Sequence, residues 1–328
     1  LIKERDRMVS LLAEFSDLIQ PLPTYSNFVL FTVTGGNKVA KQLHDDLERL
    51  GVLIRYYGGK PILQNYIRIS AGRSGDTDKL IAAMRLLRDS KIREKVTKPK
   101  AIIFDMDGVL AEVSSSYRQA IIHTCKHFGA NITRDDIAEK KASSGFNNDW
   151  DLSLALITEH VKENVPSFQQ VKDVFQDLYL GTDEKKGFYT TESLIPSKSL
   201  LAFCANKVPL AIVTGRPKDE AKLFLDLYGI GDYFGHAVCM EDTEKGKPDP
   251  QPVKKALDLL GITAGKDVIM IGDTPDDSRA AVAAGIVGLG ILPPHDKANK
   301  KLAAVMTSDS VGATYVLQDL NELRLLLS

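Results

Sequence analysis

The stretch that decides the fold reads Ala101-Ile102-Ile103-Phe104-Asp105-Met106-Asp107-Gly108-Val109-Leu110. Its first four residues are apolar without helical spacing, a pattern typical of a strand buried in a parallel sheet. The run ends abruptly on two carboxylates, Asp105 and Asp107, and then on Gly108. Crowding two like charges is costly unless a cation or a shared proton compensates them. The stretch therefore predicts a metal-dependent site at the carboxyl end of a parallel strand.

The composition is that of a globular protein. The chain has 328 residues, of which 44% are hydrophobic and 26% charged, and this length predicts two or three domains. A net charge of -1 gives no general argument for nucleic acid or an anionic membrane as a partner. The chain shows no apolar run near about 18 residues and no secretory pattern, so we expect a cytoplasmic protein. The sequence leaves the oligomeric state open.

The cysteines and the first residue add two minor expectations. Cys125, Cys204 and Cys239 are widely spaced and form no metal-binding pattern, which favours structural thiols in a reducing compartment. The sequence begins at Leu1 rather than Met, which is consistent with a piece of a longer chain.

The N-terminal segment alternates between helical and strand patterns. We predict helices over 1–20, 38–50 and 76–88, and strands over 28–33, 52–57 and 66–70. Lysines and arginines then dominate a connector over 91–100, and we place a boundary near residue 96. Residues 1–96 are therefore predicted to form a small α+β domain.

This segment resembles the C-terminal small domain of histidinol-phosphate aminotransferases. The resemblance rests on Ser26-Asn27-Phe28-Val29-Leu30, Gly51-Val52-Leu53-Ile54-Arg55 and Tyr66-Ile67-Arg68-Ile69-Ser70, in that order and spacing. It implies that Arg68 matches an arginine that holds an anionic group of the substrate, a task suited to a bidentate guanidinium. The large domain and a lysine in a cofactor-linking context are missing, so we expect this segment to be catalytically silent.

The remainder of the chain predicts an α/β core interrupted by a helical cap. Helical patterns without intervening strands cover 117–128, 134–142, 149–161 and 167–180, so we assign 111–195 to an inserted helical cap. Strand patterns over 209–213, 237–240, 267–271 and 287–291 then alternate with helical ones, and a strand at 315–317 and a helix at 321–327 close the chain. Residues 97–110 and 196–328 are thus predicted to form a doubly wound parallel α/β sheet, Rossmann-like in architecture.

Polar constellations follow several of these strands. After Asp105-Met106-Asp107-Gly108 come Ile212-Val213-Thr214-Gly215-Arg216, Lys245-Gly246-Lys247-Pro248-Asp249-Pro250, and Met270-Ile271-Gly272-Asp273-Thr274-Pro275-Asp276-Asp277. Each motif alone is commonplace. Their order, their strand-end placement and the helical insertion between the first and second together resemble the haloacid dehalogenase superfamily of phosphohydrolases.

The resemblance implies a role for each motif. Asp105 is the nucleophile, Asp107 the general acid and base, and Mg²⁺ the cofactor. The predicted metal ligands are Asp105, Asp107 through its backbone carbonyl, Asp273 and Asp277, the last of which orients either a metal-bound water or Lys247. The predicted phosphate-binding residues are Gly108, Thr214, Gly215 and Lys247. Family members that displace halide from carbon typically lack the second aspartate, so Asp107 favours phosphoryl chemistry.

The cap offers weaker candidates. The stretch Ser144-Gly145-Phe146-Asn147-Asn148-Asp149-Trp150 breaks the helical pattern, and we predict that Asn148 and Trp150 contact substrate. An equally weighted alternative is a helix N-terminus capped by Asn148 or Asp149, with Trp150 packed inside the cap. His123 and His127 are four residues apart on one helix, and we expect solvated histidines rather than metal ligands. For Arg118 and Arg216, structural and functional roles are equally open.

These observations predict a Mg²⁺-dependent phosphatase that acts on a small phosphorylated metabolite through an aspartyl phosphate. The aminotransferase-like segment suggests, by association, histidinol phosphate as that small-molecule ester. Two alternatives stay open: a phosphomutase of the same superfamily, and a non-catalytic regulatory or interaction module derived from a fusion.

Overall fold

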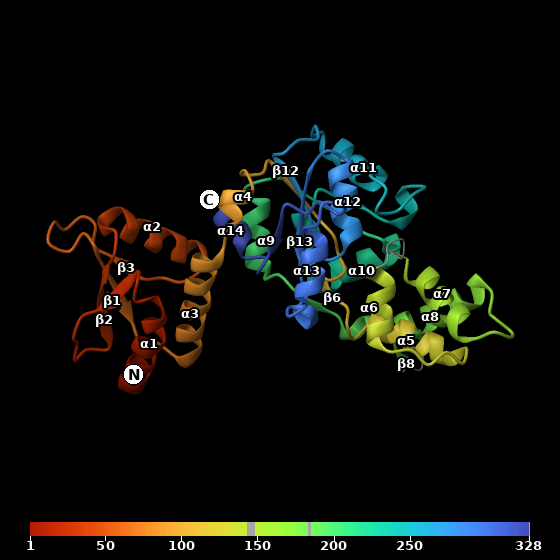
Figure 1. The fold of residues 1–328 in the computed structure, drawn as a ribbon, viewed down its shortest axis with the longest axis horizontal. Coiled ribbons are helices and arrows are strands. Elements are labelled where there is room, and N and C mark those ends of the chain that lie inside the picture. The colour runs from red at the N-terminus through yellow and green to blue at the C-terminus, as the bar shows by residue number, and fades with distance from the viewer. Residues whose placement is uncertain (143–147, 183–184, 328) are drawn as a thin grey trace. The chain divides into compact units, whose positions relative to one another are not determined.

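The computed structural model describes residues 1–142, 148–182 and 185–327, and the chain divides into two compact units (Figure 1). The first unit comprises Leu1–Arg93 together with Asn321–Leu326. The second unit comprises Glu94–Leu320 together with Leu327. The predicted fold class, a parallel α/β core with an inserted cap and a small α+β domain, is confirmed by the sheets described next.

An antiparallel sheet forms the base of the first unit. Its strands are β1 (Ile19–Pro21), β2 (Phe28–Val33), β3 (Arg55–Tyr56) and β4 (Tyr66–Ser70), in the order β1-β2-β4-β3. Burial alternates along β2, with Val29, Phe31 and Val33 turned into the core. This alternation is the expected pattern for a sheet covered on one face.

Three helices pack on this sheet: α1 (Ile2–Leu12), α2 (Gly36–Arg49) and α3 (Ser74–Asp89). The predicted helix over 1–20 was wrong in its second half, because α1 ends at Leu12 and a 3-10 turn covers Ala13–Phe15. Residues 19–21 instead pair with β2, Ile19 opposite Val33. Pro21 is tolerated there because β1 is an edge strand, where a missing N–H leaves no ladder bond unmade.

The C-terminal helix α14 (Glu322–Leu326) groups with the first unit, although the sequence prediction placed it with the hydrolase core. It contacts α2, and its leucines are buried. Arg93, in the short helix α4 (Ile92–Lys95), donates from Nε to the carbonyl of Leu325 at 2.8 Å and pairs with Asp46 at 2.8 Å. A buried apolar face and these two polar contacts determine where α14 packs.

A six-stranded sheet forms the centre of the second unit. Its strands are β5 (Ala101–Phe104), β10 (Leu210–Val213), β11 (His236–Val238), β12 (Val268–Gly272), β13 (Val287–Ile291) and β14 (Tyr315–Leu317). Every pairing is parallel, and the order is β11-β10-β5-β12-β13-β14. The fully buried strands β5, β10 and β12 therefore bring their carboxyl ends to one edge of the sheet.

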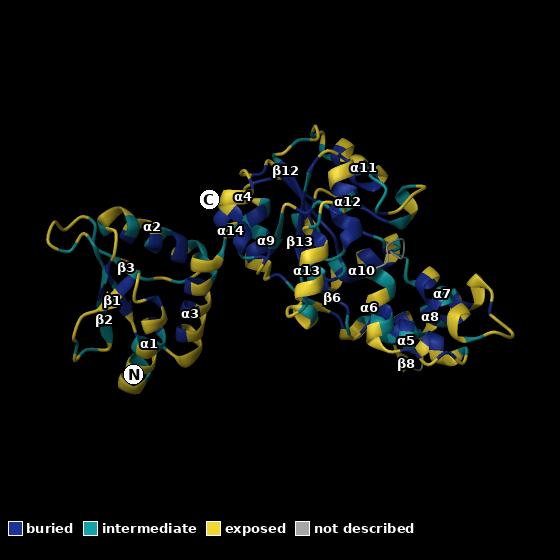
Figure 2. Ribbon diagram, viewed as in Figure 1, coloured by how far each residue is buried: buried dark blue, intermediate teal, exposed yellow. Residues whose placement is uncertain are grey.

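Helices surround this sheet, and Figure 2 shows the strands among them as the buried part of the unit. They are α9 (Lys198–Ala205), α10 (Lys218–Tyr228), α11 (Gln251–Leu260), α12 (Pro275–Ala283) and α13 (Lys300–Met306). The sequence analysis did not predict α13, whose only buried side chain is Met306. A helix with so narrow an apolar face carries little periodic signal.

The insertion between β5 and β10 forms the cap. Its helices α5 (Tyr117–His127), α6 (Arg134–Ala142), α7 (Asp149–His160) and α8 (Phe168–Leu180) gather in one group (Figure 1). A hairpin, β7 (Gly181–Thr182) and β8 (Lys185–Lys186), follows α8. The chain enters and leaves the cap through β6 (Ala111–Glu112) and β9 (Ser193–Leu194), which pair antiparallel. This strand pair is the junction between cap and core.

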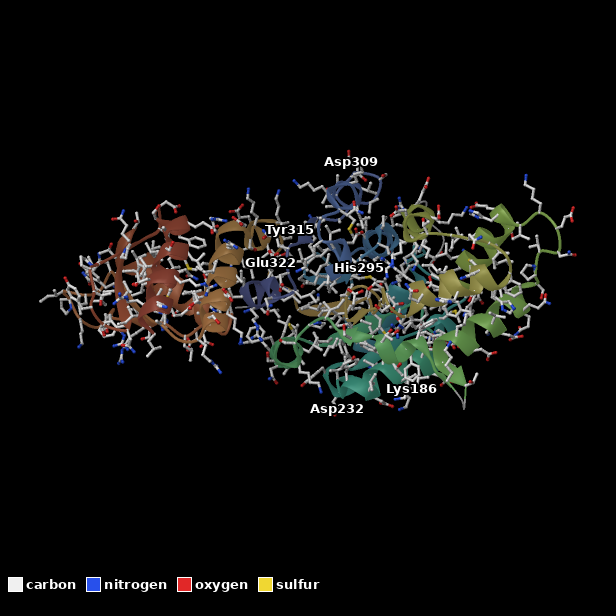
Figure 3. All side chains as sticks on the ribbon, turned by 90° about the horizontal axis from the view of Figure 1, so that it is seen from below. Lys186, Asp232, His295, Asp309, Tyr315 and Glu322 are labelled. Carbon is white, nitrogen blue, oxygen red and sulfur yellow. The ribbon has the colours of Figure 1, made fainter. Side chains whose placement is uncertain are left out.

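The surface is ordinary for a globular chain. Charged side chains such as Lys186, Asp232 and Asp309 are exposed (Figure 3). Cys125, Cys204 and Cys239 are buried and form no disulfide with one another. Within the described residues, no helix combines the length and the apolar character needed to cross a bilayer.

We predict that Ile103→Ala lowers the free energy of unfolding of the second unit by about 2–5 kcal/mol, because β5 is central and Ile103 is fully buried. Urea unfolding followed by the fluorescence of Trp150 measures this, since the sequence holds one tryptophan and it lies in this unit. The control Leu227→Ala removes a side chain that is 54% exposed on α10 and should change the value by less than about 0.5 kcal/mol. Equal effects of the two variants would contradict the placement of the core.

Candidate functional site

A buried ion-pair cluster lies at the carboxyl edge of the parallel sheet. Asp105 directly follows β5, and its Oδ1 lies 2.7 Å from Nζ of Lys247. The same Nζ lies 2.5 Å from Oδ1 of Asp277 and 3.3 Å from the carbonyl oxygen of Val213. Lys247 therefore joins the first, third and fourth predicted motifs through one ammonium group.

Three carboxylates crowd this cluster. Oxygens of Asp105, Asp273 and Asp277 all lie within 4.8 Å of one another. Burial and the charge of Asp277 raise the pKa of Asp105 to about 7. Burial and the charge of Asp105 also raise the pKa of Asp273 well above its ordinary value. Three close carboxylates against one ammonium leave negative charge uncompensated, so the donor set fits a hard divalent cation.

Gly108 leaves the space that Asp273 needs. Its φ is +73°, a conformation that residues with a side chain rarely adopt. A Cβ at this position would lie 2.1 Å from Oδ2 of Asp273. The glycine after the two acids is thus required both by the turn and by the close approach of the fourth motif.

Asp277 has two contacts that fix its orientation. It occupies the first turn of α12, where Oδ2 accepts hydrogen bonds from the backbone N–H of Thr274 at 3.0 Å and from its hydroxyl at 2.7 Å. Its other oxygen faces Lys247. Asp277 therefore anchors the ammonium group to the helix N-terminus, in keeping with one of the two predicted roles.

The second motif lies beside this cluster. Thr214 follows β10 directly and is buried, and its Oγ1 accepts a hydrogen bond from the backbone N–H of Arg216 at 3.1 Å. Gly215 lines the cavity described next. The parallel order β10-β5-β12 therefore places Thr214 next to Asp105, as the strand-end argument predicted.

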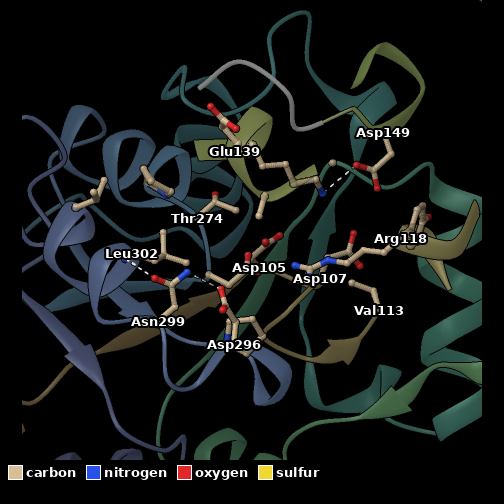
Figure 4. A pocket seen from close by; sticks show the side chains of 18 of the residues that line it. Asp105, Asp107, Val113, Arg118, Glu139, Asp149, Thr274, Asp296, Asn299 and Leu302 are labelled. Carbon is tan, nitrogen blue, oxygen red and sulfur yellow. Dashed lines mark hydrogen bonds and ion pairs between the residues drawn. The ribbon is translucent and has the colours of Figure 1, made fainter. Parts of the chain in front are cut away.

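A cavity of about 310 Å³ separates these residues from the cap (Figure 4). Asp105, Asp107, Lys247 and Asp273 line its core side. Its cap side is lined by Val113, which follows β6, and by residues of α5, α6 and α7, namely Tyr117, Arg118, Glu139, Lys141 and Asp149. A further wall comes from the segment before α13 and from α13 itself, namely Pro293, Asp296, Asn299 and Leu302. The size suits a small metabolite.

Cations from the cap face the acids of the core. The side chain of Arg118 forms no hydrogen bond or ion pair with the described residues, and it extends from α5 toward Asp107 (Figure 4). Lys141 Nζ pairs with Oδ1 of Asp149 at 2.9 Å. The charges of Lys141 and Arg118 partly offset the rise in the pKa of Asp273. The cap thus adds positive charge where an anion would meet the acids.

Asn148 and Trp150 match the helix-capping alternative in their contacts. Oδ1 of Asn148 accepts from the backbone N–H of Trp150 at 2.9 Å, so Asn148 is the N-cap of α7. Trp150 is buried, edge-on to Phe168 and beneath the ammonium of Lys172. Both residues also line a hollow of about 20 Å³ that reaches Asp107, so contact with a substrate stays a prediction. Residues 144–147 of the predicted cap loop lie outside the described residues.

The cap histidines have aromatic neighbours. The ring of His123 lies 5.4 Å from that of Phe188, and the ring of His127 lies 4.8 Å from that of Phe128, centroid to centroid. The described acidic and histidine residues that could hold a metal together are Asp105, Asp273 and Asp277.

Sequence comparison identifies the family. A profile of the haloacid dehalogenase-like hydrolases matches residues 102–291, more than half of the chain. The chain therefore belongs to the haloacid dehalogenase-like hydrolase family, and the predicted resemblance is confirmed. Its second unit is a hydrolase with phosphatase relatives.

Three curated relatives match different shares of the chain. It is 38% identical over 227 residues to imidazoleglycerol-phosphate dehydratase of Phytophthora nicotianae, a match that covers 66% of this chain and 50% of that protein. It is 28% identical over 194 residues to phosphoglycolate phosphatase of Yersinia pseudotuberculosis, 58% of this chain and 80% of that one. The N-terminal segment is 41% identical over 85 residues to histidinol-phosphate aminotransferase 1 of Arabidopsis thaliana, 26% of this chain and 20% of that enzyme.

Solved structures share the fold. A phosphoglycolate phosphatase, predicted as such, from Haemophilus somnus covers 69% of this chain and 96% of its own, with a TM-score of 0.53 and 20% identity. A family hydrolase from Deinococcus radiodurans, solved with bound phosphate and sodium, covers 69% and 94%, with a TM-score of 0.51 and 25% identity.

The sequence left the role of Arg216 open and gave no indication of Glu192. Arg216 donates from Nε to Oδ1 of Asp107 at 2.7 Å, and its Nη1 lies 3.0 Å from Oε2 of Glu192. Arg216 carries a signal in the sequence, because it lies two residues after Thr214 and so belongs to the second motif. Glu192 had none, because it lies in the connection that leaves the cap, far from every motif.

We predict that Gly108→Ala weakens Mg²⁺ binding by about tenfold or more, because the new Cβ displaces Asp273. Titration calorimetry with MgCl₂ measures the affinity directly. The control Gly246→Ala has no atom within 4 Å of its added Cβ and should bind Mg²⁺ as the wild type does. An unchanged affinity in Gly108→Ala would show that Asp273 lies outside the metal site.

Proposed function

We propose that this chain is a Mg²⁺-dependent phosphatase that hydrolyses a small phosphate ester through an aspartyl phosphate on Asp105. The observation that carries the proposal is the buried cluster in which Lys247 holds Asp105 and Asp277 at the wall of the cavity, beside Asp273. Family membership supports the same reaction class. The bound phosphate in the Deinococcus radiodurans relative supports an anion site in this fold.

Three acids that the structure brings together support a metal site. Asp105, Asp273 and the backbone carbonyl of Asp107 would hold Mg²⁺, with Asp277 beside them. When bound, Mg²⁺ neutralises part of the negative charge of the ester and so reduces its repulsion of the nucleophile.

The protein's own groups account for both chemical steps. A carboxylate oxygen of Asp105 attacks phosphorus, and the bond from phosphorus to the ester oxygen breaks. Asp107 gives its proton to the leaving oxygen. Water then attacks the aspartyl phosphate, its proton passes to Asp107, and the bond from phosphorus to Asp105 breaks to release phosphate. Lys247, Thr214 and the N–H groups around Gly215 and Gly108 hold the remaining phosphoryl oxygens.

For the substrate we propose histidinol phosphate. Two relatives, each covering a different stretch of chain, bear names of imidazole or histidinol phosphate enzymes. The match to the Phytophthora protein covers 66% of this chain and is much longer than the first unit. More than half of the aligned residues therefore lie in the second unit, the hydrolase unit. This chain spans half of that protein's length, so its dehydratase activity belongs to that protein alone.

The lining of the cavity supports a substrate of mixed charge. Arg118 and Lys247 present positive charge near the acids that would hold the metal. Glu139 on α6 and Asp296 beyond β13 present carboxylates elsewhere on the wall (Figure 4). Histidinol phosphate carries a phosphate at one end, an ammonium group on the middle carbon of its side chain and an imidazole ring at the other end, so it presents both signs of charge to such a lining.

We predict that, with Mg²⁺, histidinol phosphate is hydrolysed with a kcat/KM at least about tenfold above those of phosphoglycolate, pyrophosphate and glucose 1-phosphate. Phosphate release from a panel of these esters measures it. Asp105→Asn should lower kcat at least about a thousandfold, because an amide cannot form the acyl phosphate.

The panel also tests the alternatives. Hydrolysis of another ester in preference to histidinol phosphate would overturn the substrate assignment but keep the reaction class. Glucose 6-phosphate formed from glucose 1-phosphate in the presence of a bisphosphate would identify a phosphomutase. Full activity of Asp105→Asn would contradict the reaction class itself.

A further inference from the structure

Arg216 is a buried cation that joins the core to the cap junction. Its side chain is 1% exposed, and it follows β10 on the core. It contacts two carboxylates, that of Asp107 after β5 and that of Glu192 immediately before β9. Its guanidinium also stacks over the rings of Tyr117 and Phe224, at 4.7 and 5.3 Å from their centroids.

The geometry of the guanidinium leaves it little freedom. Nε and Nη2 lie 2.7 and 2.6 Å from the same oxygen of Asp107. Nη1 and Nη2 contact the two oxygens of Glu192 at 3.0 and 3.2 Å, and Nη1 also donates to the hydroxyl of Tyr179 at 3.1 Å. A planar guanidinium that makes all of these contacts at once has one orientation. The ammonium group of a lysine could not make the same set of contacts.

Glu192 is held as firmly as Arg216. It is 2% exposed, and besides Arg216 its Oε1 accepts from the hydroxyls of Ser116 at 2.8 Å and Tyr179 at 3.0 Å. Burial raises the pKa of Glu192, and the charge of Arg216 opposes that rise. Removing one partner of such a pair leaves a buried charge without compensation. The two side chains therefore keep each other in place.

The exposed fractions of the side chains differ between the two ends of the network formed by Asp107, Arg216 and Glu192. Glu192 and Arg216 are closed off from solvent, whereas Asp107 is 29% exposed and lines the cavity. The carboxylate of an aspartate can face either the cavity or the protein, depending on its side-chain torsions. Arg216 limits that choice, because both its bonds to Asp107 end on Oδ1 and leave Oδ2 for the cavity.

We propose that Arg216 is a positioning residue for the proton transfers of Asp107, and that Glu192 anchors it to the junction between core and cap. Because β9 begins at the next residue, Ser193, the orientation of Asp107 depends on how the cap is joined to the core. The proposal rests on the proposed phosphatase function. Arg216 itself is closed off by 1% exposure, so its effect on the ester passes through Asp107.

The test uses two leaving groups. p-Nitrophenolate leaves phosphorus without a proton, so the rate of its release reports attack by Asp105 alone. An alkoxide requires the proton of Asp107. In single-turnover experiments, Arg216→Lys and Glu192→Gln should release p-nitrophenolate at close to the wild-type rate. The same variants should cleave the alkyl ester that is turned over fastest in the panel at least about tenfold more slowly.

Glu220→Gln is the matched control. Glu220 is a buried carboxylate of the same neighbourhood that bonds Tyr117 and Gln176 instead of Arg216. It should keep the wild-type ratio of the two rates. Expressing each rate per mole of phosphoenzyme removes the effect of any misfolded fraction.

Two outcomes would overturn the proposal, and they are distinguishable. If Arg216→Lys and Glu192→Gln slow both esters equally, or neither, the ion pair is structural only and the phosphatase function stands. If the wild type forms no phosphoenzyme from either ester, the proposed function fails and the positioning role fails with it.

Discussion

The contact between Lys247 and the carboxylates of Asp105 and Asp277 is the interaction on which the rest of the site depends. These three charged groups can be buried only together, because burying any one of them without a partner of opposite charge is strongly unfavourable. Although burial by itself lowers the pKa of Lys247, the two acids raise it above its ordinary value, so the ammonium stays charged. Asp105 follows β5, Asp277 lies in α12 after β12, and Lys247 lies in the segment between β11 and α11, so the three residues meet at the carboxyl edge of the parallel sheet. The parallel sheet brings the carboxyl ends of these strands together, and β5 and β12 are buried along their whole length.

The cap supplies the side of the cavity that the core does not line. The core supplies the acids, while α5 and α6 add Arg118, Lys141 and Glu139 across the cavity. The junction strands β6 and β9 therefore connect the core, which carries the acids, to the cap, which lines the other side of the cavity. His295 adds a contact at the entry to the cap, since its Nδ1 lies 2.9 Å from Oε1 of Glu112, the last residue of β6 (Figure 3). Arg216 and Glu192 perform the corresponding task at the exit.

Much of this could be predicted because strand-end motifs carry a local signal. Asp105, Thr214 and Asp273 each follow an apolar run, and parallel strands place such ends side by side. Long-range contacts carried no such signal. Glu192 lies 24 residues from Arg216 in a connection without periodicity, and α14 packs on the first unit through leucines that fit either unit by pattern alone. The helix predicted through residue 20 failed for the same reason, because pairing of Ile19 with Val33 outweighs local propensity. For Trp150, the sequence weighted a substrate contact and a packed helix start equally, and its neighbours in the structure are those of a packed helix start.

The most direct test of the account is to locate the phosphoryl group on the protein. Asp107→Asn should form the aspartyl phosphate from p-nitrophenyl phosphate and then hydrolyse it slowly, since it lacks the base for the second step. Acid quenching of this variant with Mg²⁺, followed by peptide fragmentation in a mass spectrometer, should place one hydroxylamine-sensitive phosphate on Asp105. A phosphate on any other residue, or turnover by the wild type with no phosphoenzyme in either protein, would contradict the assignment of Asp105 as the nucleophile.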